Sequence, residues 1–244
     1  MTPPLVTVIT VCYNSAALIE ETIQSVLGQD YPNLEYLIVD GASTDGTLDI
    51  IRKYADRLKY VSEPDKGIYD AMNKGLKMAG GEWVNFMNAG DYLADRSVLT
   101  NIFGEGGQLS TAKNSEQIRV IGGNTLNMYP DGHIEEHHAE HADVIPERMP
   151  FSHQASFVRI QPDKVSFDLK YKYAADYKMF YDLYFEYGKD AFLVLETAIA
   201  KYRQEDSLTM NPRNQHQIKG EYLRIQSAHR SLHWWKTYLK WRLL

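Results

Sequence analysis

The fold is decided by the stretch Leu34-Glu35-Tyr36-Leu37-Ile38-Val39-Asp40 and the residues that follow it, Gly41-Ala42-Ser43-Thr44-Asp45-Gly46-Thr47. The first half is an apolar, partly β-branched run that predicts a strand, and the second half is a glycine-containing turn. A helical pattern follows, with apolar residues at Leu48, Ile51 and Tyr54. An acidic residue between a strand and a turn that leads into a helix is typical of ligand crevices in open α/β sheets. We therefore expect Asp40 to lie at such a crevice.

The first half of the chain repeats this alternation of strand and helix. We expect strands at 5–11, 34–39, 59–62 and 83–87, and helices at 18–27, 48–54, 68–79 and 95–103. Alternating elements of these lengths predict right-handed βαβ units and a largely parallel sheet. The strand at 83–87 leads into Asn88-Ala89-Gly90-Asp91, which brings a second carboxylate to the same sheet edge.

In the second half the pattern becomes antiparallel. The turn Pro130-Asp131-Gly132 predicts a hairpin between 120–129 and the residues from His133 onward. We also expect a mobile loop at 104–115, strands at 155–159 and 191–195, and a helix at 173–187. The predicted fold is therefore an α/β domain over 1–205, with a first half at 1–103 whose crevice would hold a nucleotide and a second half at 104–205 that builds the other wall. Its sheet is mainly parallel, with antiparallel additions.

The remaining segment, 206–244, is predicted to be a basic, aromatic helical tail. Residues 213–244 contain seven lysines and arginines and one acid, Glu221, and they include Trp234, Trp235 and Trp241. Apolar residues at alternating three- and four-residue steps predict an amphipathic helix over about 214–243. Such a helix either packs on the body of the domain or lies in the headgroup region of an anionic membrane.

The composition excludes several classes of protein. The net charge of −6, in spite of the basic tail, argues against nucleic acid as the main partner. The single cysteine, Cys12, excludes an internal disulfide and is expected to be a small buried residue. Histidines at 133, 137, 138 and 141 have no cysteine partners, so a solvated strand is a better interpretation than a zinc site. We expect neither a secretion leader nor a membrane-spanning segment.

Several motifs together resemble family 2 glycosyltransferases of the GT-A fold, over about residues 5–205. Those shared with the whole family are Val8-Ile9-Thr10-Val11-Cys12-Tyr13-Asn14, Asp40-Gly41-Ala42-Ser43-Thr44-Asp45-Gly46-Thr47, Gly80-Gly81-Glu82-Trp83 and Asn88-Ala89-Gly90-Asp91. Others resemble the small bacterial enzymes that build O-antigen, capsule and exopolysaccharide repeat units: Ile68-Tyr69-Asp70-Ala71-Met72-Asn73-Lys74-Gly75, Ser152-His153-Gln154 and Ala174-Ala175-Asp176-Tyr177.

This resemblance implies a nucleotide-diphospho-sugar donor, Mg²⁺ or Mn²⁺ as cofactor, and inversion at the anomeric carbon. The residues that it implies for donor binding are Tyr13, Asn14, Asp40, Asp65, Lys66, Asn73, Asn88 and Asp91. Asp91 corresponds to the metal ligand, and His153 and Gln154 are candidate contacts of the acceptor or the diphosphate. The chain departs from the commonest family pattern at Asn88 and Gly90, where many relatives have a further aspartate, so the donor itself is expected to supply much of the metal coordination.

Asp176 is the candidate general base for the acceptor hydroxyl, because it lies at the start of a helix in the second half, where the family's base resides. Two other classes remain open: a non-catalytic scaffold subunit with the same fold, and a nucleotidyltransferase. The latter usually has a glycine-rich, basic phosphate loop after its first strand, where this chain reads Cys12-Tyr13-Asn14-Ser15.

The acceptor is expected to be a glycan on a polyprenyl diphosphate. The expected location is the cytoplasmic face of a bacterial inner membrane, with peripheral attachment through the tail. A second copy of the chain is a further candidate partner.

Overall fold

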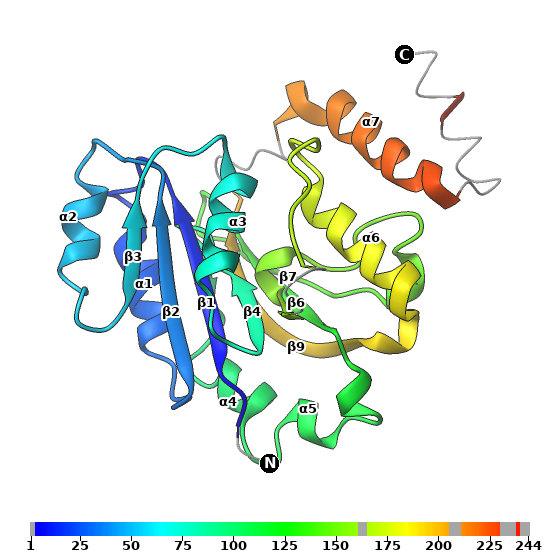
Figure 1. The fold of residues 1–244 in the computed structure, drawn as a ribbon, viewed down its shortest axis with the longest axis horizontal. Coiled ribbons are helices and arrows are strands. Elements are labelled where there is room, and N and C mark those ends of the chain that lie inside the picture. Colours follow the sequence, from blue (N-terminus) through cyan, green and yellow to red (C-terminus); the bar gives the residue numbers. More distant parts are fainter. Residues whose placement is uncertain (1–2, 161–164, 205–210, 230–237, 240–244) are drawn as a thin grey trace.

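The structure is a computed structural model, and it describes residues 3–160, 165–204, 211–229 and 238–239 (Figure 1). In this described part the strands form one sheet, in the order β3-β2-β1-β4-β8-β6-β9-β5, with β7 paired to β6. The strands are β1 (Val6–Cys12), β2 (Leu34–Asp40), β3 (Lys59–Ser62), β4 (Trp83–Phe86), β5 (Tyr92–Leu93), β6 (Val120–Met128), β7 (Ile134–His137), β8 (Ser156–Arg159) and β9 (Phe192–Arg203).

The first half of the sheet is parallel, as predicted. Strand β1 pairs in parallel with β2 and β4, and β2 pairs in parallel with β3. All seven residues of β1 are buried, as expected for a central strand covered on both faces. Antiparallel pairs begin at β8, which joins β4 to β6. The predicted α/β fold, with a parallel first part and antiparallel additions, is confirmed.

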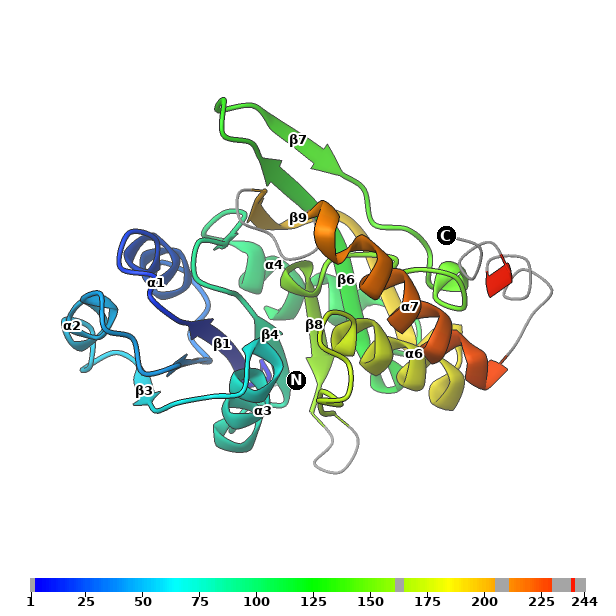
Figure 2. The same cartoon turned by 90° about the horizontal axis from the view of Figure 1, so that it is seen from above.

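Helices cover both faces of the sheet (Figure 2). They are α1 (Ile19–Leu27), α2 (Thr47–Arg52), α3 (Ile68–Met78), α4 (Val98–Phe103), α5 (Gln108–Thr111), α6 (Ala175–Tyr187) and α7 (Gln215–Gln226). Alternate residues of β1 point to opposite faces: Val6 and Val8 pack with α1, α2 and α4, whereas Ile9 and Val11 pack with α3 and α6. The sheet is therefore the middle of three layers.

Three parts of the chain differ from the prediction by more than a few residues or in type of element. The strand expected at 191–195 is β9, which continues to Arg203 and pairs with both β6 and β5. The expected loop at 104–115 contains the short helix α5. The predicted 214–243 helix is observed as α7, followed by a single 3₁₀ turn at Ser227–His229. Residues 230–237 and 240–244, which include Trp234, Trp235 and Trp241, lie outside the described residues.

Helix α7 lies beside α6 in both views of the fold (Figures 1 and 2). Its buried residues are Glu221, Leu223, Ile225 and Gln226, and Ile225 belongs to the same core cluster as α6. The ring of Tyr222 stacks on that of Tyr177, with centroids 4.2 Å apart. At least this part of the tail therefore packs on the domain. Among the described residues, no helix combines the length and the apolar character that crossing a membrane requires.

Candidate functional site

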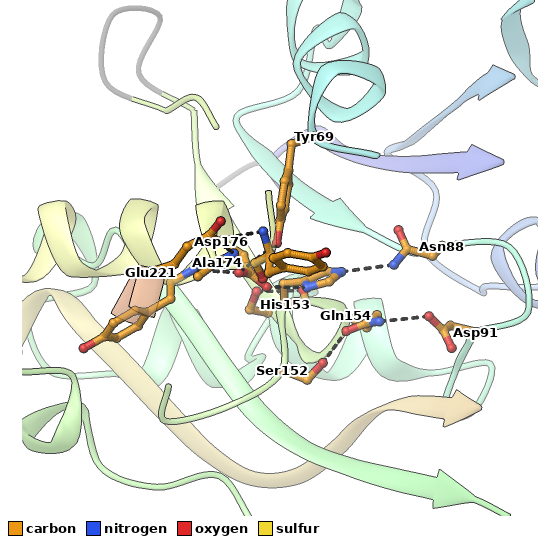
Figure 3. Close-up of polar contacts among 12 residues, drawn as sticks. Tyr69, Asn88, Asp91, Ser152, His153, Gln154, Ala174, Asp176 and Glu221 are labelled. Carbon is orange, nitrogen blue, oxygen red and sulfur yellow. Dashed lines mark hydrogen bonds and ion pairs between the residues drawn. The ribbon is translucent and has the colours of Figure 1, made fainter. Parts of the chain in front are cut away.

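A cavity of about 760 Å³ lies where the carboxyl end of β4 meets the second half of the chain. One wall is formed by the turn Asn88–Asp91, and the opposite wall by α6 and α7, through Asp176, Ile218 and Tyr222. Ser152, His153 and Gln154 also line the cavity. It therefore brings together Asn88, Asp91, His153, Gln154 and Asp176, all of which the sequence predicted as site residues (Figure 3).

Asp176 is held by three hydrogen bonds on the cavity wall. Its Oδ1 accepts from the hydroxyl of Tyr69 at 3.1 Å and from the main-chain N–H of Tyr177 at 2.8 Å. Its Oδ2 lies 3.0 Å from Nδ1 of His153. Burial and the negative charge of Asp176 raise the pKa of Tyr69 above its ordinary value, so this hydroxyl remains a donor. A carboxylate fixed in this way is aimed at the cavity as a candidate base.

A chain of polar contacts connects Asp176 with the opposite wall (Figure 3). Nε2 of His153 lies 3.2 Å from Nδ2 of Asn88, while Nδ1 faces Asp176. A neutral imidazole that carries its hydrogen on Nδ1 satisfies both contacts, because Nδ1 then donates to the carboxylate and Nε2 accepts from the amide. His153 therefore fixes the position of Asp176 relative to the Asn88–Asp91 turn.

Asp91 is a buried carboxylate, with 5% of its surface exposed. Its Oδ2 accepts a hydrogen bond from Nε2 of Gln154 at 2.9 Å, and its Oδ1 accepts from the main-chain N–H of Arg203 at 3.1 Å. The hydroxyl of Ser152 donates to Oε1 of Gln154, which fixes the orientation of that amide. Burial raises the pKa of Asp91 to about 6, although the hydrogen bonds from Arg203 and Gln154 partly oppose this shift.

The residues of this turn fit a divalent cation. Oδ1 of Asn88 is buried and has no hydrogen-bond partner among the described residues, since the amide nitrogen is the atom that faces His153. Gly90, with φ of 97°, allows the turn to fold back so that the main-chain N–H of Asp91 bonds to the Asn88 carbonyl at 3.0 Å. An amide oxygen and a carboxylate are hard ligands of the kind that Mg²⁺ and Mn²⁺ prefer. The described residues contain no group of three or more histidine, cysteine or acidic side chains that could hold a metal, so most ligands would come from the substrate and from water.

Asp40 lies at the predicted strand end but below the surface, with 0% of it exposed. Its carboxylate accepts hydrogen bonds from the main chain and hydroxyl of Ser43 and from the hydroxyl of Ser62. Burial and the Asp40 carboxylate also raise the pKa of the Cys12 thiol, which is buried as predicted. Asp40 is therefore a support of the Ser43 turn and of β3, and it does not line the cavity.

The other residues predicted for the nucleoside end surround Gly41. An added Cβ at Gly41 would lie 2.6 Å from Oδ2 of Asp65 and 3.3 Å from the ring of Tyr13, so any larger residue would displace the Asp65 carboxylate. Tyr13 is 65% exposed. The amide of Asn14 accepts from the main-chain N–H of Thr44 at 2.9 Å, which ties the β1 loop to the β2 loop. Tyr13, Asn14 and Asp65 thus form a surface patch outside the cavity, which we call the ledge.

Two further predicted donor contacts lie elsewhere. Lys66 is exposed, and its main-chain N–H donates to the Asp70 carboxylate at 3.0 Å. Both ends of the Asn73 amide bond to the main chain of Phe167, at 2.8 and 2.9 Å. Asn73 therefore fixes the loop that precedes α6, and it does not line the cavity.

Sequence reasoning missed two residues that contact the site. Tyr69 belongs to the Ile68–Gly75 motif but carries no charge at neutral pH, and its contact with Asp176 spans 107 positions in sequence. Glu221 counted only as the single acid in a basic segment. It is buried, and its carboxylate accepts main-chain hydrogen bonds from the segment that leads into α6. The signal in the sequence was one acid among basic residues. A carboxylate is seldom buried without partners, and its partners here are main-chain N–H groups, which a sequence does not show.

Comparison with known proteins finds glycosyltransferases of similar sequence. A PGL/p-HBAD biosynthesis glycosyltransferase of Mycobacterium bovis is 36% identical over 106 residues, which are 42% of this chain and 41% of that protein. The Escherichia coli protein WfaP, described as a UDP-Glc:α-D-GlcNAc-diphosphoundecaprenol β-1,3-glucosyltransferase, is 36% identical over 100 residues, 40% of each chain. The aligned parts thus span about two fifths of the length of these relatives.

A solved structure extends the likeness to nearly the whole fold. The mannosyltransferase PcManGT of Pyrobaculum calidifontis, in complex with GDP-Man and Mn²⁺, matches with a TM-score of 0.70 and 20% sequence identity. The match covers 93% of this chain and 65% of that one, and at this identity it shows the GT-A fold alone. Residues 7–154 match the family model described as glycosyl transferase family 2. The chain therefore belongs to the family 2 glycosyltransferases.

Proposed function

We propose that the protein is an inverting glycosyltransferase that moves a sugar from a nucleotide-diphospho-sugar, of the UDP type, to a hydroxyl group of a glycan acceptor. The observation that carries this proposal is the placement of Asp176 on the same cavity as the Asn88–Asp91 turn. A base for the acceptor on one wall and oxygen ligands for a diphosphate-bound cation on the other are what a direct displacement needs.

In this mechanism Asp176 takes the proton from the acceptor hydroxyl as the hydroxyl oxygen attacks the anomeric carbon. The bond between that carbon and the diphosphate oxygen breaks, and the electron pair leaves with the nucleoside diphosphate. His153 and Tyr69 hold the two carboxylate oxygens of Asp176 during the step. The products are the glycosylated acceptor, the nucleoside diphosphate and a protonated Asp176, which returns its proton to solvent.

Asp91 and the amide oxygen of Asn88 would hold Mg²⁺ or Mn²⁺ together with the donor diphosphate. When bound, the cation supplies positive charge beside the leaving diphosphate. Gln154 and the main chain of Arg203 fix the Asp91 carboxylate in place. The PcManGT structure, which contains Mn²⁺ and a nucleotide sugar, supports a divalent metal on the same fold.

Inversion is supported by the number of carboxylates at the cavity. Of the described residues that line it, Asp91 and Asp176 carry one each. Asp91 is enclosed by its bonds to Gln154 and Arg203, which leaves Asp176 to face the acceptor. A single displacement requires one base, whereas a double displacement requires a nucleophile on the opposite face of the sugar.

The donor nucleoside is proposed to lie on the ledge formed by Tyr13, Asn14 and Asp65, next to the turn that Asp40 supports, with the exposed Lys66 beside it in sequence. Replacing Tyr13 by alanine is expected to raise the Kd for UDP about tenfold or more, because stacking of a base on an aromatic ring contributes about 1–3 kcal/mol. Isothermal titration calorimetry with UDP and Mn²⁺ measures this change. Tyr60→Ala, a change on β3 outside the ledge, is the matched control, and an unchanged Kd for Tyr13→Ala would remove the ring from the donor site.

The function itself is tested by a panel of UDP-, GDP- and dTDP-sugars with Mn²⁺. A transferase is expected to show a metal-dependent thermal shift with one class of donor and to release its nucleoside diphosphate. A scaffold subunit would bind the donor without turning it over. A nucleotidyltransferase would instead release pyrophosphate from a nucleoside triphosphate and a sugar phosphate.

The acceptor is proposed to be a glycan on a polyprenyl diphosphate, at the cytoplasmic face of a bacterial inner membrane, in the synthesis of a surface polysaccharide. Two observations support this proposal: the name of WfaP contains a diphosphoundecaprenol-linked acceptor, and the sequence beyond α7 is basic and rich in tryptophan. Four lysines and arginines follow residue 229, each worth about 1 kcal/mol near an anionic surface.

A protein that ends at residue 229 is therefore expected to bind anionic phosphatidylglycerol vesicles at least about tenfold more weakly than the full chain does. Co-sedimentation measures the difference, and neutral phosphatidylcholine vesicles are the control. Equal binding of the two proteins to anionic vesicles would exclude the tail as the membrane contact.

A further inference from the structure

The side chain of Glu221 on α7 is buried against the main chain that leads into α6. It is 9% exposed, and its carboxylate accepts hydrogen bonds from the main-chain N–H groups of Lys172, Tyr173 and Ala174, each at 2.9 Å. Three successive N–H groups that converge on one anion form a strong, charge-assisted contact. Glu221, which belongs to α7, therefore fixes the main chain of residues 172–174.

This segment ends where the candidate base begins. Ala174 is the N-cap residue of α6, and Asp176 lies in the first turn of that helix. Ala174 itself offers no side-chain cap. A carboxylate supplied by another helix satisfies main-chain donors at the start of α6, and its negative charge is favourable at a helix amino terminus.

The main chain of Tyr173 is held at both its N–H and its carbonyl group. Its N–H donates to Glu221, and its carbonyl oxygen lies 3.1 Å from the hydroxyl of Tyr69, the same hydroxyl that contacts Oδ1 of Asp176. One continuous set of contacts thus joins Glu221, Tyr173, Tyr69 and Asp176. Figure 3 labels Tyr69, Asp176 and Glu221. A shift of the Tyr173 main chain would move both the start of α6 and the hydroxyl that orients the carboxylate.

Helix α7 is itself fixed on α6. Nε2 of Gln226 donates to the carbonyl of Glu147 at 2.7 Å and to the hydroxyl of Tyr177 at 3.0 Å, while Tyr222 stacks on the Tyr177 ring. Ile218 and Tyr222 reach the cavity from the same helix. The carboxylate of Glu221 thus rests on a rigid support.

We propose that Glu221 is a positioning residue for the transfer reaction: through the Lys172–Ala174 main chain it sets the geometry of Asp176, so that α7 is part of the active site. This inference rests on the proposed role of Asp176. Misplacement of a reacting group by about 1 Å can cost about 10²-fold in rate. Because the nucleoside ledge lies on the loops that follow β1 and β3, away from α6 and α7, this cost should fall on kcat and leave donor binding unchanged.

The test compares Glu221→Gln with Lys219→Gln, an exposed position on the same helix. The first change keeps the shape of the side chain but removes the charge and one accepting oxygen. We expect kcat to fall about tenfold to 100-fold, with the Kd for UDP and the KM for the donor within twofold of wild type, and no change for Lys219→Gln. Full kcat in a folded Glu221→Gln protein would overturn the proposal. So would a loss of kcat and UDP binding in parallel, because that indicates a general loss of folded protein.

A double-mutant cycle separates this inference from the assignment of the base. If Glu221 acts through Asp176, Glu221→Gln should lower the residual rate of Asp176→Asn by less than twofold. An additive loss would show that Glu221 acts through a group other than Asp176. Full activity of Asp176→Asn alone would instead show that Asp176 is not the base, and any effect of Glu221→Gln would then have another cause. If Glu221→Gln does not fold, Glu221→Asp, which keeps the charge on a shorter side chain, undergoes the same cycle.

Discussion

Replacing Asp176 by asparagine is expected to lower kcat for transfer by about 10²–10⁴-fold, the usual contribution of a general base. The amide has nearly the shape of the carboxylate and keeps an oxygen that can accept from Tyr69, but it cannot take the proton of the acceptor hydroxyl. Donor binding is expected to remain within twofold of wild type, because the nucleoside ledge is separate from α6. Nucleoside diphosphate release and calorimetric titration with UDP measure the two quantities.

The matched control is Asp182→Asn on the exposed side of the same helix, where Asp182 pairs with Lys178 at the surface. A surface ion pair of this kind contributes about 0–1 kcal/mol, so this variant should retain full activity and nearly full stability. A folded Asp176→Asn protein that transfers sugar at the wild-type rate would show that another group accepts the proton. In that case the contacts among Asp176, His153 and Tyr69 would have a structural role only.

Local sequence patterns predicted the first half of the fold well. Strand β1 and helix α3 have strong periodicities and clear ends, and their boundaries differ from the predicted ones by one residue. Strand β9 was predicted too short because Glu196, an exposed acid, interrupts its apolar run. Its extension to Arg203 depends on pairing with β6 and β5, which are distant in sequence and leave no local pattern.

The site shows the same division between local and distant information. Residues in contiguous motifs, such as Asn88, Asp91, His153 and Asp176, were predicted and lie on one cavity. Asp40 was also predicted, but a sequence does not show that two serine hydroxyls and a turn would enclose it. Tyr69 and Glu221 reach the site through tertiary packing, which only the structure reveals.

Asp91→Asn is expected to lower metal-dependent transfer strongly and, without metal, to stabilise the protein at neutral pH. The pKa of Asp91 is raised from 3.8 to about 6 because the carboxylate is buried. As the pH rises from 4 to 7, the unfolded chain loses this proton before the folded protein does, so the folded protein loses stability relative to the unfolded chain. The shift corresponds to about 3 kcal/mol at pH 7.5, a cost that asparagine does not carry.

The surrounding groups can accommodate the introduced amide. If the side-chain amide of Gln154 turns over, its Oε1 accepts from the new amide nitrogen and its Nε2 donates to the hydroxyl of Ser152, while the new amide oxygen accepts from the Arg203 main chain. We therefore expect Asp91→Asn to raise the unfolding free energy of the metal-free protein by about 1–3 kcal/mol at pH 7.5, and by much less at pH 4.5. Urea unfolding at the two pH values measures this difference, with the exposed Asp56→Asn as control.

Adding Mn²⁺ with UDP should reverse the order of stability. A bound cation compensates the buried negative charge of Asp91, and a ligand at 100 times its Kd stabilises the folded protein by about 2.7 kcal/mol. The wild type should gain this stabilisation and the variant should not, while transfer by the variant falls at least about 100-fold through loss of the metal's charge at the leaving diphosphate. If Mn²⁺ and UDP stabilise both proteins equally, the buried carboxylate is not a metal ligand, and its high pKa follows from packing alone.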